Sequence, residues 1–269
     1  MSTDTTDTTT TTAATTVVPE AAHQRTALIT GGSRGLGRAT ALALAEAGVD
    51  VVITYRSGEA EARQVVAEVE ARGRRGAALH LDTIDVASFD SFAARLRDLL
   101  PEGRFDILVN NAGTALYSPL RETTQEQFDQ VFAVHVKGPF FLTQALEPLL
   151  RDGGRIVNTS SALTRMTFAR SGPYASAKGA LEVLTRYQAL EYGDRGITAN
   201  TIAVGAVPTD FGGGHLRNNP QLQQQMADSA ALGRLATPED IGAAIAGLTT
   251  ASGTWITGQR IEASGGVRL

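Results

Sequence analysis

The stretch TALITGGSRGLGRATALALAEAG (residues 26–48) decides the fold. Its first five residues predict a buried strand, and the apolar spacing over residues 35–47 predicts a helix. The turn between them places glycines at positions 31, 35 and 37, spaced G-x3-G-x-G. Glycine lets the backbone turn tightly, and the free N–H groups at a helix N-terminus favour an anion. The stretch therefore predicts a pyrophosphate-binding turn, although a glycine turn alone is also compatible with a plain connection.

The rest of the chain repeats the alternation of strand and helix. Strands are predicted at residues 26–30, 50–55, 77–81, 105–110, 154–160, 197–203 and 259–263. Helices are predicted at residues 35–47, 58–72, 87–99, 124–150, 173–193 and 238–250. The strand segments lack strict polar alternation, which indicates burial on both faces. We therefore predict one α/β domain over residues 23–269, a Rossmann-type doubly wound parallel sheet with helices on both faces.

Composition excludes several classes of function. The chain has 24 Lys and Arg against 28 Asp and Glu, a formal charge of −4 that gives no reason to expect nucleic acid or an anionic membrane as partner. It has no cysteine, and its four histidines lie far apart, so no metal site is predicted. Residues 1–22 are rich in Thr and lack the features of a secretory signal. We expect a disordered tail there and a cytoplasmic location.

The end of the second strand bears on the choice of cofactor. An NAD site usually places an acid there to bind the ribose 2′-hydroxyl, but residues 53–57 read ITYRS. Arg56 emerges at that end, and Arg34 lies in the glycine turn. Two guanidinium groups suit a 2′-phosphate, so the sequence predicts NADPH. The alternative is that both are solvated surface arginines.

Several motifs occur together and in order. They are TGGSRGLG (30–37), NNAG (110–113), Ser161, YASAK (174–178), GRLATPEDI (233–241) and ITGQRIEASGG (256–266). From about Arg25 onward the chain resembles the short-chain dehydrogenase/reductase family, most closely its NADPH-dependent ketoreductases of the 3-oxoacyl-carrier-protein-reductase type. The resemblance implies reduction of a small-molecule ketone. It also implies a homotetramer or homodimer joined through the helices near 124–150 and 173–193.

The resemblance assigns catalytic roles to three residues. Tyr174 would be the general acid, Ser161 would hold the carbonyl oxygen, and Lys178 would bind the nicotinamide ribose. Tyr174 and Lys178 are four residues apart and so share one helix face. A nearby ammonium favours the phenolate, so we expect Lys178 to lower the pKa of Tyr174 toward neutrality. The alternative for this pair is an ordinary pair on a helix surface.

The resemblance also implies cofactor contacts along the whole chain. These are Gly31, Ser33, Arg34, Gly35, Leu36, Gly37, Arg56, Asp82, Asn110, Ala112, Gly113, Tyr174, Lys178, Gly205, Val207 and Thr209. Within this set Asp82 would contact the adenine, and Val207 and Thr209 would hold the nicotinamide amide. As alternatives, Asp82 is compatible with a loop or helix-capping acid, and the others with ordinary turn residues.

Two positions depart from the family pattern. His135 stands in HVKG where the family usually has Asn, and Val204-Gly205 stands where it usually has Pro-Gly. The family's Asn helps hold a water that links the catalytic lysine to solvent. We expect His135 to tune this relay without being indispensable. The alternative is a buried neutral histidine.

The substrate is the least specified part. The segment GGGHL (212–216) predicts a flexible lid. Apolar side chains at Leu163, Met166, Phe168 and Phe211 indicate either a pocket or core, and Arg165 and Arg170 either meet an anionic carrier or are surface residues. Besides ketone reduction, two functions stay open: nucleotide sensing without turnover, and oxidation of an alcohol.

Overall fold

The computed structural model describes residues 23–250 and 253–269. They form a seven-stranded sheet of order β3-β2-β1-β4-β5-β6-β7 in which every neighbouring pair is parallel. The strands are β1 (Thr26–Ile29), β2 (Asp50–Tyr55), β3 (Gly76–His80), β4 (Phe105–Asn110), β5 (Leu150–Ser161), β6 (Thr198–Val204) and β7 (Arg260–Ala263). The predicted doubly wound fold is confirmed. The predicted tail at 1–22 lies outside the described residues, so its boundary stays a prediction.

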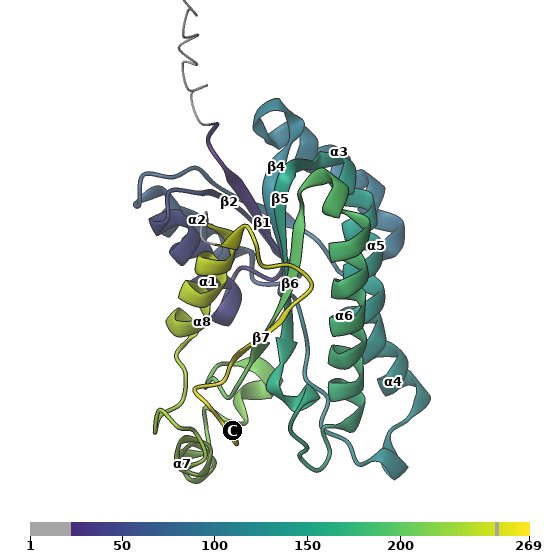
Figure 1. Cartoon of the computed structure of the whole chain (residues 1–269), viewed down its shortest axis with the longest axis vertical. Helices are drawn as coiled ribbons and strands as arrows, with labels where there is room; N and C mark the ends of the chain where they lie inside the picture. The colour runs from purple at the N-terminus through teal and green to yellow at the C-terminus, as the bar shows by residue number, and fades with distance from the viewer. Residues whose placement is uncertain (1–22, 251–252) are drawn as a thin grey trace, which may run out of the picture.

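Helices cover both faces of the sheet (Figure 1). One layer contains α1 (Gly35–Glu46), α2 (Glu59–Glu70) and α8 (Pro238–Thr249). The other contains α3 (Phe89–Leu99), α5 (Gly138–Leu146) and α6 (Gly172–Glu191), with α4 (Gln125–Phe132) packed against α6. Successive strand residues enter opposite cores: Ile29 packs under the first layer and Leu28 under the second. This is why the strands read as continuous apolar runs.

The strand order reverses beside β1, whose neighbours are β2 and β4. Ile29 lies level with Ile53 of β2 and Val109 of β4. The chain therefore leaves all three strands at the same edge of the sheet. In open parallel sheets this switch point is where ligands bind.

The helix predicted over residues 124–150 is interrupted. A π-helical turn over Ala133–Lys137 separates α4 from α5, and Gly138 donates its N–H to the Ala133 carbonyl five residues back. Pro139 has no N–H, so it cannot bond to the His135 carbonyl in the usual i→i+4 pattern. The predicted strand at 154–160 also begins earlier, at Leu150.

Helix α7 (Pro220–Asp228) was not predicted. The side chain of Asn219 caps it by accepting the Leu222 N–H at 3.0 Å, and Pro220 occupies its first turn. Asn-Pro is a recognised helix start, but the run QLQQQ gives no apolar periodicity. The sequence therefore indicated only where α7 begins, through Asn219 and Pro220, and not that a helix follows.

Part of the surface is apolar. On α6 the exposed residues are Val183, Tyr187 and Leu190, and on α4 and α5 they are Phe128, Phe140 and Phe141. Trp255, the single tryptophan of the chain, is 97 % exposed in the connection between α8 and β7. Among the helices of the described ranges, none has the length and apolar character needed to cross a membrane.

Candidate active site

The glycine turn after β1 has a backbone that a ligand can approach closely. Gly31 and Gly35 have φ of +67° and +54°, which favour glycine. A Cβ on Gly37 would lie 2.2 Å from the Gly31 carbonyl oxygen, so only glycine fits there. Helix α1 begins at Gly35 without a side-chain cap and without an acid in its first turn. Its first N–H groups are therefore open to an anion.

Side chains from neighbouring strands hold this turn. Asn111 donates from Nδ2 to the carbonyls of Thr30 at 2.9 Å and Gly31 at 3.2 Å. The Thr30 hydroxyl accepts from the Asn111 and Ala112 N–H groups, and the Thr54 hydroxyl accepts from the Gly31 N–H. Asn111, Thr30 and Thr54 were not among the predicted site residues. The second Asn of NNAG was the available signal, since a buried turn needs such a donor.

Arg34 lies in the glycine turn and Arg56 directly follows β2. Both are exposed at the edge of the sheet beside the glycine turn, and neither guanidinium has an ion pair or side-chain hydrogen bond within residues 23–250 and 253–269. Asp50 lies at the opposite end of β2, where it accepts from Arg75 at 2.7 Å. The turn, the open helix end and the two free cations fit a dinucleotide phosphate.

Three further predicted cofactor residues lie at or after the ends of β3 and β4. Asn110 turns its side chain into the interior, where Nδ2 donates to Asn158 at 2.8 Å, so only its main chain faces this edge. Asp82 follows β3 and accepts the Ile84 N–H at 3.2 Å, as a turn acid does. Gly113 has no room for a Cβ, which would lie 2.7 Å from the His135 ring.

The segment after β6 reaches the glycine turn. A Cβ built on Gly35 would lie 3.8 Å from the Thr209 side chain, so these residues face each other across the edge. Ser264 packs directly against the backbone of Gly205, because a Cβ on Gly205 would lie only 2.7 Å from the Ser264 Cα. Val207 is partly buried and packs against the core beneath the α1, α2 and α8 layer. Three segments far apart in sequence thus surround one site.

Ser161, Tyr174 and Lys178 are buried together. Ser161 ends β5, while Tyr174 and Lys178 lie one turn apart on α6. The Ser161 hydroxyl accepts the Leu163 N–H at 3.2 Å and lies near enough to Tyr174 to lower the pKa of the phenol. Lys178 donates from Nζ to the Thr159 carbonyl at 2.7 Å and lies 5.7 Å from the centre of the Tyr174 ring. The surface-pair alternative for Tyr174 and Lys178 is therefore wrong.

Burial dominates the titration of both groups. It raises the pKa of Tyr174 well above its usual value, an effect that Tyr117 reinforces and the Ser161 hydrogen bond opposes. It lowers the pKa of Lys178 to about 7. The expected lowering of the Tyr174 pKa is thus wrong for the protein chain, because desolvation penalises the phenolate. The phenol keeps its proton at neutral pH.

His135 lies in the π-helical turn, with 1 % of its surface exposed. Its Nε2 lies 2.7 Å from the Thr114 carbonyl oxygen and donates to it. Nδ1 is buried and has no hydrogen-bond partner among the described residues. The ring meets Tyr174 edge to face at 5.2 Å. Burial and then Lys178 hold the pKa of His135 well below its usual value, so the imidazole is neutral.

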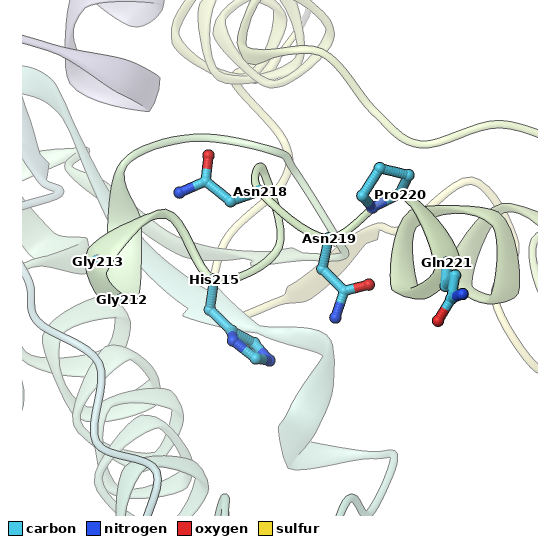
Figure 2. A pocket seen from close by; sticks show the side chains of 7 residues that line it. All are labelled: Gly212, Gly213, His215, Asn218, Asn219, Pro220 and Gln221. Carbon is cyan, nitrogen blue, oxygen red and sulfur yellow. The ribbon is translucent and has the colours of Figure 1, made fainter.

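The segment predicted as a lid, residues 212–216, follows a residue that contacts Tyr174. Phe211 meets the Tyr174 ring at 5.9 Å, and His215 meets Tyr117 at 6.1 Å. Gly212, Gly213 and Gly214 all have positive φ, between +64° and +72°. Figure 2 shows His215 and Asn219 turned to the same side of the segment, where lid residues and the start of α7 line a cavity of about 740 Å³.

Comparison with known proteins agrees with this geometry. A family profile described as "Enoyl-(Acyl carrier protein) reductase" matches residues 31–268. A Hydroxynaphthalene reductase-like protein, Arp2 of Metarhizium brunneum, is 36 % identical over 92 % of this chain and 96 % of its own. The chain belongs to the short-chain dehydrogenase/reductase family.

Two solved structures of this family resemble the chain closely. LugOII, described as a promiscuous reductase that catalyses keto-reduction at C1 during lugdunomycin biosynthesis, is 39 % identical with a TM-score of 0.83 and covers 90 % of this chain and 96 % of its own. LanV, an angucycline C-6 ketoreductase with bound NADP, is 36 % identical with a TM-score of 0.84 over 90 % and 95 %. The present protein is an NAD(P)-dependent short-chain carbonyl reductase.

In this short-chain reductase, two positions that the sequence left open are now placed: Met166 lies in a core and Arg165 is an exposed residue paired with an acid. Met166 packs with Ala162, Ala230 and Val267 in a small core. Arg165 forms an ion pair with Glu262 at 2.6 Å, so it is not free to meet an anionic carrier. Sequence separation hid most of these contacts, because Ala230, Val267 and Glu262 lie more than 60 residues away.

Proposed function

We propose that this protein uses NADPH to reduce a ketone on a fused-ring aromatic substrate. The observation that carries the proposal is the burial of Ser161, Tyr174 and Lys178 in one cluster beside Phe211. The reduced nicotinamide, when bound, supplies a hydride to the carbonyl carbon. Tyr174 gives its phenolic proton to the carbonyl oxygen, and the Ser161 hydroxyl donates a hydrogen bond to the same oxygen as negative charge develops.

Lys178 has a positioning role in this scheme. An ammonium group carries three N–H donors, and one is used on the Thr159 carbonyl. The other two are free to hold the ribose hydroxyls of the cofactor. Burial raises the pKa of Tyr174, so the phenol carries at neutral pH the proton that ketone reduction consumes.

The choice of NADPH rests on Arg34 and Arg56. Their unpaired guanidinium groups flank the turn that would receive the phosphates, and no acid stands at that end of β2. Bidentate contacts from arginine suit a 2′-phosphate. LanV and a blue fluorescent protein, the latter 34 % identical, are described with bound NADP and NADPH respectively, which supports the same choice.

The substrate class rests on the aromatic residues around Tyr174. Tyr117, Phe211 and His215 offer ring faces to a planar ligand. The relatives' names point the same way, since hydroxynaphthalenes and angucyclines are fused-ring compounds. NADPH oxidation should therefore be faster with 2-tetralone, which has the naphthalene skeleton, than with linear ethyl acetoacetate. Turnover of a crotonyl thioester alone would instead indicate double-bond reduction.

Tyr174→Phe tests the mechanism. The variant loses the proton donor and little volume, so kcat for ketone reduction should fall by about 100- to 10,000-fold. NADPH affinity, measured by fluorescence titration, should stay within about threefold. A variant that keeps most of its kcat would exclude Tyr174 as the acid. A wild-type protein that binds NADPH and reduces no carbonyl would favour the nucleotide-sensing alternative.

We further propose that His135 tunes the proton relay as a neutral group. Its orphaned Nδ1 is an acceptor that lies within the electrostatic influence of Lys178, where a water would complete its hydrogen bonding. Pro139 has no N–H to donate to the His135 carbonyl in the usual helical pattern, which supports a second acceptor for such a water at this position.

We also propose that the chain assembles into a homodimer or homotetramer. The exposed apolar residues of α6 lie at positions 183, 187 and 190, which share one helix face. Those of α4 and α5 lie in the same layer of the fold. Apolar side chains gathered in this way support burial against a second copy of the chain.

A further inference from the structure

Glu182 is a carboxylate outside the predicted site, and it links the chain segments that contain the site residues. Glu182 lies on α6, one turn beyond Lys178 and two beyond Tyr174, and its side chain is only 12 % exposed. Its Oε1 accepts from the Ser160 hydroxyl at 2.7 Å and the Thr164 hydroxyl at 2.8 Å. It also accepts from Arg260 Nε of β7 at 3.0 Å. Three chain segments therefore meet at one oxygen atom.

Two of these donors lie on either side of Ser161 in the chain. Ser160 immediately precedes it, and Thr164 closes the turn that follows it. Strand side chains alternate, so Asn158 and Ser160 both turn toward α6 and bond to it. Glu182 thus fastens both ends of the Ser161 turn to the helix that carries Tyr174 and Lys178.

A second ion pair extends this attachment toward the end of β7. Arg260 also donates to Glu262 at 2.9 Å, and Glu262 accepts from Arg165 at 2.6 Å. Arg165 follows Thr164 directly and donates to the Val267 carbonyl at 2.6 Å. The hydrogen bonds from Arg165 hold the pKa of Glu262 at about 2. The Ser161 turn is therefore held by ionic contacts from α6 and from β7.

We infer that Glu182 is a positioning residue that sets the Ser161 hydroxyl against the Tyr174 phenol. The inference rests on the proposed role of Ser161 in holding the carbonyl oxygen. A displacement of about 1 Å in a reacting group can cost about 100-fold in rate, so a rigid attachment at this turn matters for turnover. Arg260 keeps the carboxylate oriented toward the two hydroxyls.

The test compares Glu182→Ala with Glu191→Ala, which removes an exposed acid of the same helix. With 2-tetralone and NADPH, Glu182→Ala should lower kcat by about tenfold or more, with NADPH affinity within about twofold of the control. Glu182→Gln keeps an oxygen acceptor for Ser160 and Thr164, so it should recover most of kcat. Amide hydrogens of residues 160–168 should exchange about tenfold faster in Glu182→Ala, measured without substrate.

Ser161→Ala separates this inference from the proposed function. If Glu182 acts through Ser161, Glu182→Ala should change kcat less than twofold in a Ser161→Ala background. An equal loss in both backgrounds, or a kcat within twofold of the Glu191→Ala control, would overturn the inference. A Ser161→Ala protein with wild-type kcat would refute the role of Ser161 itself, and the inference with it.

Discussion

At the scale of the residue, substitution of Arg56 is the most direct test of the preference for NADPH over NADH. Arg56→Asp replaces an unpaired cation by an anion at the end of β2, where a 2′-phosphate would lie. It removes attraction and adds repulsion, so the preference for NADPH over NADH should fall roughly tenfold or more. Dissociation constants for both cofactors, measured by fluorescence, check this.

The matched control is Arg97→Asp, which makes the same charge change at an exposed position near the end of α3. It should leave both affinities unchanged. Equal affinity of the wild-type protein for the two cofactors would contradict the assignment of Arg34 and Arg56.

Lys178 should make stability depend on pH. Burial lowers its pKa to about 7 from 10.5, so between these values the unfolded chain binds more protons than the folded one. The contribution of Lys178 to the free energy of unfolding therefore rises with pH from about 7 to 10.5. Lys178→Met lacks this dependence, so its stability relative to wild type should be highest below pH 7 and decline toward pH 10.

Urea unfolding at pH 6, 8 and 10 measures this difference. Lys137→Met, which removes the only other lysine of the chain from an exposed position, should follow the wild-type curve in parallel. Parallel curves for Lys178→Met as well would show that Lys178 does not titrate in this range.

At single residues, the sequence predicted which side chains lie together better than it predicted their pKa values. Tyr174 and Lys178 lie together because a four-residue interval places two side chains on one helix face, whereas only the family resemblance placed Ser161 with them. The direction of the Tyr174 pKa shift was wrong. Desolvation depends on how many atoms the lid and neighbouring helices place around the phenol, and Phe211 and His135 come from distant segments.

At the scale of the element, the lid gives a paired prediction. Gly212 and Gly213 have φ of +64° and +72°, so alanine at either costs about 1–2 kcal/mol of backbone strain. A Cβ on Gly212 would also lie 3.0 Å from Tyr117, whereas one on Gly213 meets no atom within 4 Å. Gly212→Ala should therefore raise KM for 2-tetralone severalfold more than Gly213→Ala.

Steady-state kinetics with NADPH in excess measures both variants. Cofactor affinity should be the same in the two, since the change is confined to the lid. Similar KM values for both variants would mean that the Tyr117 contact does not shape the substrate site.

Strong periodic patterns predicted their elements and weak ones did not. The strands at 50–55 and 105–110 have the predicted bounds, because their apolar runs end at polar residues. The glutamine-rich α7 was missed, since its stability comes from its cap rather than from an apolar face. The break between α4 and α5 was signalled only by Gly138 and Pro139 inside an otherwise helical pattern.

At the scale of the whole molecule, the exposed apolar face of α4, α5 and α6 predicts assembly. Light scattering at micromolar concentration should show a dimer or tetramer. A Val183→Glu, Leu190→Glu double variant places two charges on that face and should be a folded monomer. Gln64→Glu, on α2 in the opposite layer, should assemble as wild type does. A monomeric wild-type protein would contradict the prediction.

The architecture as a whole was predictable, whereas its long-range ionic contacts were not. Alternating strands and helices with a glycine turn after the first strand predict a doubly wound parallel sheet, as the structure has, although they leave the strand order open. Nothing in the sequence indicates that Glu182 meets Ser160, 22 residues away, or Arg260, 78 residues away. Such pairs depend on which side chains the finished fold brings face to face.

The near-complete exposure of Trp255 has a practical consequence for anyone following this protein by its intrinsic fluorescence. The indole already sits in water in the folded chain, so denaturation hardly alters its surroundings and its emission is a poor monitor of folding. The same property makes it a sensitive monitor of contact. Any partner that covers the connection between α8 and β7 would shift the emission to shorter wavelength, without a label and without interference from a second tryptophan.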